Sequence, residues 1–145
     1  MENLYKNDNF CVEKMNDWYL IKFLNSPVSG KNFDRVVFII KEFYKEKKQI
    51  KQSLNLIFDI NKLGILECKY INKIKKMVNS MKDSQSVINF NIYLIIKAKI
   101  IRGIVKSIIK TINYRISSVH YGIVEKLEDA IVLIEKERIL EEKKN

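Results

Sequence analysis

The chain has 145 residues, of which 47% are hydrophobic, and it carries a formal net charge of +10. This length suits one domain spanning residues 1–145, with a core from about residue 9 to residue 140 and a polar tail at each end. No apolar run is long enough for a membrane span, residues 1–9 lack the apolar core of a signal peptide, and the two cysteines, Cys11 and Cys68, are expected as free thiols in the cytoplasm.

The first half of the chain alternates between strand-like and helical segments. Residues 10–14 and 18–24 are strand-like, and Asn16-Asp17 between them suits a tight turn, so we expect a β-hairpin. Asn32 can cap a helix whose apolar positions have helical spacing: Phe33, Val36, Val37, Ile40, Phe43 and Tyr44. Residues 54–60 then form an apolar run that is typical of a buried strand.

The second half repeats this alternation. A helix is predicted where apolar residues recur at steps of three and four: Ile71, Ile74, Met77, Val78 and Met81. Residues 87–97 alternate like a strand, and residues 98–113 have the strongest helical pattern of the chain. A strand over 117–124 and a last helix from Leu127, ending in a frayed Glu-Lys tail, complete the order.

This order predicts an α/β fold. Strands that alternate with helices need crossover connections and a largely parallel sheet, and the hairpin adds an antiparallel strand at or near one edge. We therefore expect one mixed, mostly parallel sheet of about five strands, covered by four main helices.

The end of the strand at 54–60 and the segment after it carry a more specific signal than the element order alone. Residues 58–71 read FDINKLGILECKYI, and together with the element order they resemble the STAS fold, named for sulfate transporters and anti-sigma-factor antagonists, and its CRAL-TRIO-like relatives. The resemblance covers roughly residues 9–140 and implies a partner-binding loop that contains Asp59, Gly64, Glu67 and Cys68. Regulatory members usually carry Asp-Ser-Ser-Gly at residues 67–70, so Cys68 replaces the phosphorylated serine, which argues against that switch.

Residues that carry chemistry are few. His120 is the only histidine and has no assignable partner, so a structural role is favoured over a general base, and too few ligands are present for zinc. For Asp59 a loop or capping role is favoured over a metal or phosphate-acceptor role. Cys68 would be reactive if a helix dipole lowered its pKa, but Glu67 opposes this and a packing role is favoured. We expect the protein to have no enzymatic activity and to bind no cofactor.

The basic excess is concentrated in residues 61–115, which contain 12 basic and 2 acidic residues. If the two central helices lie on the same side of the sheet, they form an anion-facing patch. Its predicted members are Lys73, Lys76, Lys99, Arg102, Lys106 and Lys110. The alternative is an ordinary solvated face, because lysine is enriched throughout this chain.

Two functions from different classes follow. The first is a non-enzymatic, STAS-like interaction or regulatory module that binds a protein partner through a helix and the loop around Gly64. The alternative is a small-molecule or lipid binding protein of the CRAL-TRIO-like type, with an apolar pocket beneath Ile-rich helices, and a closed core competes with it. The basic surface also suits anionic lipid, whereas nucleic acid is less favoured because no aromatic residues interleave the row from Lys99 to Lys110.

Overall fold

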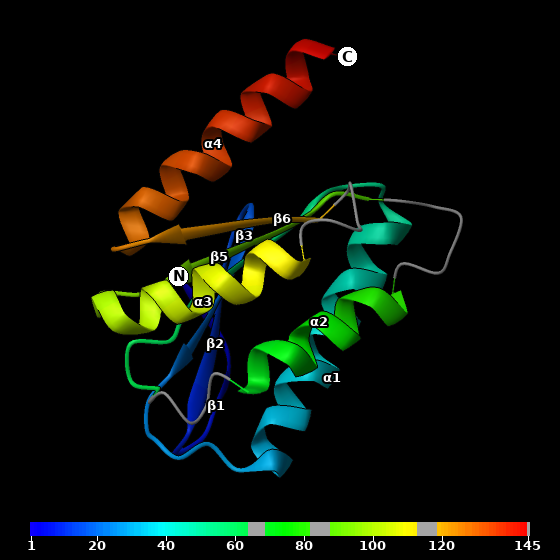
Figure 1. The fold of residues 1–145 in the computed structure, drawn as a ribbon. Coiled ribbons are helices and arrows are strands. Elements are labelled where there is room, and N and C mark those ends of the chain that lie inside the picture. Colours follow the sequence, from blue (N-terminus) through cyan, green and yellow to red (C-terminus); the bar gives the residue numbers. More distant parts are fainter. Residues whose placement is uncertain (64–68, 82–87, 113–118, 145) are drawn as a thin grey trace.

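The structure is a computed structural model that describes residues 1–63, 69–81, 88–112 and 119–144 (Figure 1). In these residues six strands form one sheet: β1 (Glu2–Lys6), β2 (Phe10–Met15), β3 (Trp18–Phe23), β4 (Leu54–Asp59), β5 (Phe90–Ile95) and β6 (Val119–Val124). The helices are α1 (Gly30–Gln49), α2 (Lys69–Met81), α3 (Lys99–Ile112) and α4 (Leu127–Lys144). None of these helices is long and apolar enough to cross a bilayer.

The strands follow one another across the sheet in sequence order. β1, β2 and β3 are antiparallel neighbours, whereas β3, β4, β5 and β6 are paired in parallel. The predicted α/β class, the mixed and mostly parallel sheet, the hairpin and the helices are therefore confirmed. The order of the parallel strands never reverses, so this sheet has no switch point of the kind that opens a ligand crevice in many α/β folds.

Both segments that were expected as polar tails contain regular structure. β1 pairs with β2 from Glu2 opposite Lys14 to Lys6 opposite Cys11, and this adds a sixth strand. Of its residues only Tyr5 is partly buried, so β1 lacks the apolar alternation that reveals a half-buried strand. At the other end α4 continues to Lys144 instead of fraying after its apolar first half.

The three crossover helices cover one face of the sheet. α1, α2 and α3 pack side chains such as Phe33, Met77 and Val105 against the same core as Phe58 and Ile92 of the central strands. Of the described helices only α4 lies on the opposite face, where Ala130 and Ile134 meet a smaller cluster of buried residues from β3, β4, β5 and β6 (Figure 1): Trp18, Leu20, Ile57, Tyr93, Ile95 and Val124.

The start of α1 differs from the prediction. Its N-cap is Ser29 rather than Asn32: Ser29 has an extended backbone, and its hydroxyl oxygen accepts a hydrogen bond from the backbone N–H of Asn32 at 3.1 Å. The side chain of Asn32 is instead bonded to Asn7 and Asn9 next to β2. The helix therefore begins at Gly30, two residues before the predicted cap.

Candidate functional site

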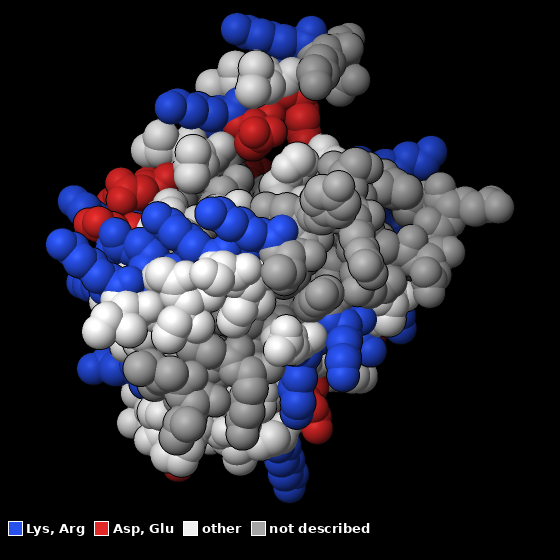
Figure 2. Space-filling model, viewed as in Figure 1, with Lys and Arg blue, Asp and Glu red and all other residues white. Residues whose placement is uncertain are grey.

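A row of four basic residues runs along one flank of α3. Lys99, Arg102, Lys106 and Lys110 follow one another at steps of three, four and four, which places them on one side of a helix. The neighbouring side of α3 holds the buried residues Val105 and Ile109, so packing on the sheet fixes the direction in which the row points. Figure 2 shows a band of basic side chains between α3 and α4. We call these four residues the basic row.

Arg102 anchors the basic row to the end of the sheet. Its Nη2 donates to the carbonyl oxygens of Ile96 and Lys97, each at 3.2 Å, and lies 3.2 Å from a carboxylate oxygen of Glu125. Among the described residues, Lys99, Lys106 and Lys110 have no such acidic partner, and all three are exposed. The row therefore presents three uncompensated cations to solvent.

The predicted basic residues of α2 lie elsewhere. α2 packs between α1 and α3 on the same face of the sheet, as the prediction required. However, Nζ of Lys73 lies 5.3 Å from the ring centroid of Tyr70 and 5.9 Å from that of Phe33 in α1, whereas Arg102 of the basic row contacts Glu125, which follows β6. Lys76 is exposed on α2. The structure thus joins the cations of α3 into one row and places Lys73 toward α1.

Asp59 orders the loop after β4. Its Oδ1 accepts hydrogen bonds from the backbone N–H of Asn61 at 3.1 Å and from the side-chain amide of Asn61 at 3.0 Å. Oδ1 of Asn61 accepts in turn from the backbone N–H of Lys97 at 2.9 Å, which joins this loop to the end of β5. These contacts are those of a loop-capping residue. Gly64, Glu67 and Cys68 lie outside the described residues.

The remaining reactive side chains are dispersed. His120 is exposed on β6, and Cys11 is a buried free thiol whose pKa is raised mainly by burial. In the described ranges, no three His, Cys, Asp or Glu side chains are grouped so that they could hold a metal ion.

A polar groove of about 930 Å³ lies between the second half of α4 and the amino-terminal ends of the parallel strands. Its residues include Asp17 from the turn between β2 and β3, Asn55 from β4 and Asn91 from β5, with Arg138 and Glu141 from α4. Lysines in the last turn of α1 and just after it, together with glutamates of α4, give its walls opposite charges. Most of its lining residues are polar or charged, which suits a polar ligand better than a lipid chain.

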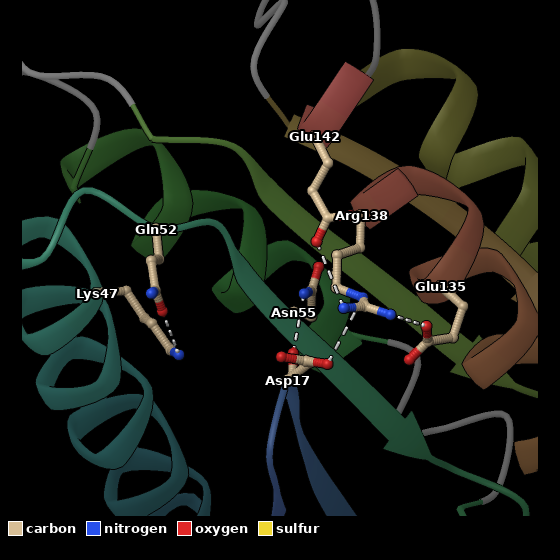
Figure 3. A network of polar contacts seen from close by, with 7 residues as sticks. All are labelled: Asp17, Lys47, Gln52, Asn55, Glu135, Arg138 and Glu142. Carbon is tan, nitrogen blue, oxygen red and sulfur yellow. Dashed lines mark hydrogen bonds and ion pairs between the residues drawn. The ribbon is translucent and has the colours of Figure 1, made fainter. Parts of the chain in front are cut away.

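Polar contacts link the walls of the polar groove (Figure 3). Asn55 donates to the main-chain carbonyl of Asp17 at 2.9 Å, and Nε of Arg138 lies 4.0 Å from a carboxylate oxygen of Asp17. Arg138 also contacts Glu135 at 2.8 Å and Glu142 at 3.5 Å within α4. The sequence analysis missed this groove; the available signal was a polar residue at matching places in two apolar strands, Asn55 and Asn91.

Comparison of the chain with protein families, with characterised proteins and with solved structures gave no significant match. The resemblance to the STAS fold therefore stays a prediction, and function is argued from the geometry.

Proposed function

We propose that this protein is a non-enzymatic interaction module that binds an acidic segment of a protein partner along the basic row of α3. The observation that carries the proposal is the uncompensated row itself. Three exposed lysines and Arg102 extend over residues 99–110, or about 16 Å of helix. Charges gathered in this way attract an acidic partner and accelerate its association.

The surface beside the basic row also suits a polypeptide. Gly103 and Ser107 are small and exposed, and an added Cβ at Gly103 would meet no atom within 4 Å. Ile100, at 72% exposure, supplies an apolar contact on the same helix. Small residues let a partner chain approach the helix closely, and an exposed apolar side chain gives it an anchor.

Acidic residues next to the row favour a protein segment over a membrane surface. Glu125 contacts Arg102, and Glu128 and Asp129 occupy the first turn of α4, where Figure 2 shows acidic side chains beside the basic band. A flat anionic bilayer that touched the basic row would also approach these carboxylates, whereas a narrow acidic segment would avoid them.

The test combines Lys99→Glu, Lys106→Glu and Lys110→Glu. A matched control changes three exposed lysines elsewhere, Lys22→Glu, Lys31→Glu and Lys41→Glu, and alters the net charge by the same amount. Binding of a fluorescent Glu-rich peptide is measured by anisotropy at about 50 and about 150 mM salt. We expect the α3 variant to lose at least about tenfold in affinity and the control to lose much less. The two variants have the same net charge, and only the α3 variant changes the basic row.

Two results would overturn the proposal. One is equal loss in both variants, which would mean that total charge alone governs binding. The other is no peptide binding by the wild type at the lower salt concentration. Anionic vesicles and duplex DNA are tested in parallel, and preferential binding to either would replace the protein segment by that partner.

A further inference from the structure

α4 is apolar on two opposite sides. Its inner side packs on the sheet through Ala130 and Ile134, with Leu127 and Ile131 partly buried beside them. Its outer side carries four large apolar residues that are 37–52% exposed: Val132, Leu133, Ile139 and Leu140. We call these four residues, together with Asp129, Lys136 and Lys143 between and beside them, the outer face of α4. A helix that is apolar on both sides is ordinarily buried on both sides.

Nothing among the described residues covers this outer face. α4 is the one described helix on its side of the sheet (Figure 1). The exposed sides of α2 and α3, in contrast, carry lysines such as Lys76 and Lys106. The apolar residues of the outer face therefore distinguish α4 from an ordinary solvated helix.

The outer face is symmetric about Lys136. Leu133 and Ile139 are each three residues from it, Val132 and Leu140 four, and Asp129 and Lys143 seven. With 3.6 residues per turn, all of these positions lie on one side of the helix. Asp129 and Lys143 are both exposed, so each is available to a partner.

This symmetry favours a second copy of the chain as the partner. In an antiparallel pair of α4 helices with the two-fold axis at Lys136, every residue lies at the level of its mirror position in the other copy. At both ends Asp129, which is near the centre line of the outer face, then meets Lys143, and the four apolar residues of one copy lie against the same four residues of the other. Apolar side chains meet apolar side chains, and each carboxylate meets an ammonium group.

We infer that the outer face of α4 binds a second copy of this chain in an antiparallel, two-fold symmetric dimer. The two Lys136 side chains meet at the axis, where their long stems carry the charges to solvent. A single helix pair is smaller than a standard interface of about 1,600 Å². The dimer is therefore reversible and depends on protein concentration. This surface is separate from the basic row and does not rest on the proposed function.

The test exchanges the two charges that face each other. Asp129→Lys and Lys143→Asp each place like charges at both ends of the helix pair, so each variant alone should self-associate at least about fivefold more weakly than wild type. In an equimolar mixture, the lysine introduced in one copy faces the aspartate introduced in the other, and association should return. Residues 129 and 143 are about 21 Å apart along one helix, so no contact within a chain can produce this rescue.

Self-association is measured by sedimentation over about 5 to about 500 µM, where the wild-type mass should rise from 17.2 kDa toward twice that value. Glu128→Lys is the matched control for Asp129→Lys, because it makes the same charge change in the same turn on a different side of the helix. It should weaken association much less. Circular dichroism checks that every variant is folded.

Three outcomes would overturn the inference. The first is a wild type that remains a monomer throughout the concentration range. The second is a mixture that associates no better than its separate components. The third is unchanged association of the double variant Val132→Ser/Leu140→Ser, which would assign self-association to another surface. Capture of a different protein on the outer face by a wild type that stays monomeric would likewise replace the second copy as its occupant.

Discussion

Asn91 of β5 donates its side-chain amide to Oδ1 of Asn55 in β4 at 2.8 Å. Asn91 is only 3% exposed, and it is the one buried polar residue among those described. Asn55 donates further to the main-chain carbonyl of Asp17, so the two amides connect the centre of the sheet to the hairpin. A buried amide that loses its partner keeps its desolvation cost, and this pair is therefore a sensitive point of the fold.

Asn55→Ala is expected to lower the free energy of unfolding by about 1–3 kcal/mol, because it removes the acceptor of the buried Asn91 amide. The double variant Asn55→Ala/Asn91→Ala should cost less than the sum of the two single changes, since neither amide is then left unpaired. Urea denaturation measures all three. Asn3→Ala on the exposed strand β1 is the control and should change stability by less than about 0.5 kcal/mol. Strict additivity would contradict the coupling.

The two described glycines of β6 and α3 should respond to alanine with opposite signs. A Cβ at Gly122 would lie 3.0 Å from Cδ1 of Tyr93, which is buried beneath α4, so Gly122→Ala should destabilise by about 1–3 kcal/mol. A Cβ at Gly103 would meet nothing within 4 Å in the middle of α3, so Gly103→Ala should stabilise by about 1 kcal/mol. Thermal unfolding measures both. Equal changes of stability in the same direction would show that the Tyr93 ring moves aside at no energetic cost.

The sequence predicted those strands and helices in which burial requires apolar residues at regular spacing. Ile88, Phe90, Ile92, Leu94 and Ile96 alternate in the sequence, and all five lie in the core beneath the crossover helices. β1 was not predicted because an edge strand with little burial needs no regular spacing of apolar residues. The full length of α4 was not predicted because its second half is fixed by contacts distant in sequence, such as Ser53 Oγ to Glu141 at 2.9 Å.

The candidate site was predictable only within single elements. The spacing of Lys99, Arg102, Lys106 and Lys110 is sufficient to place them on one helix flank, and all four lie on α3 in the structure. The direction of Lys73 toward α1 depends on how α2 is rotated on the sheet, which its sequence leaves open. The polar groove depends on the register that sets Asn55 beside Asn91, 36 residues away.

The N-cap of α1 gives a third prediction. Ser29→Ala removes the acceptor for the backbone N–H of Asn32 and should cost about 1 kcal/mol of stability. Ser29→Asp should retain the cap and add a favourable charge to a first turn that contains no acidic residue. Chemical denaturation compares the variants. Ser107→Ala, the same change at an exposed position inside α3, is the control and should be neutral or slightly stabilising. A cost equal to that of Ser29→Ala would contradict a specific capping role.

The last prediction concerns Tyr121, a residue of β6 that packs against the core beneath the crossover helices. Burial raises the pKa of Tyr121 to about 12, and its hydroxyl has no hydrogen-bond partner among the described residues. The folded state therefore favours the neutral phenol, whereas the unfolded chain ionises near pH 10. Stability should fall as the pH rises above about 10, because only the unfolded state gains from losing the proton.

Tyr121→Phe removes the ionisable group and isolates this effect. At pH 8 the variant should be as stable as wild type or slightly more stable, since it deletes a buried hydroxyl that lacks a partner. At pH 11 it should be more stable by about a further 1.4 kcal/mol, which is the difference produced by a pKa raised from 10.0 to about 12. Urea denaturation of both proteins at pH 8, 10 and 11 measures the difference. Burial also raises the pKa values of Tyr19, Tyr44 and Tyr93, so both proteins should weaken at high pH. An advantage for Tyr121→Phe that stays constant from pH 8 to pH 11 would show that the Tyr121 hydroxyl ionises as readily in the folded state as in the unfolded chain.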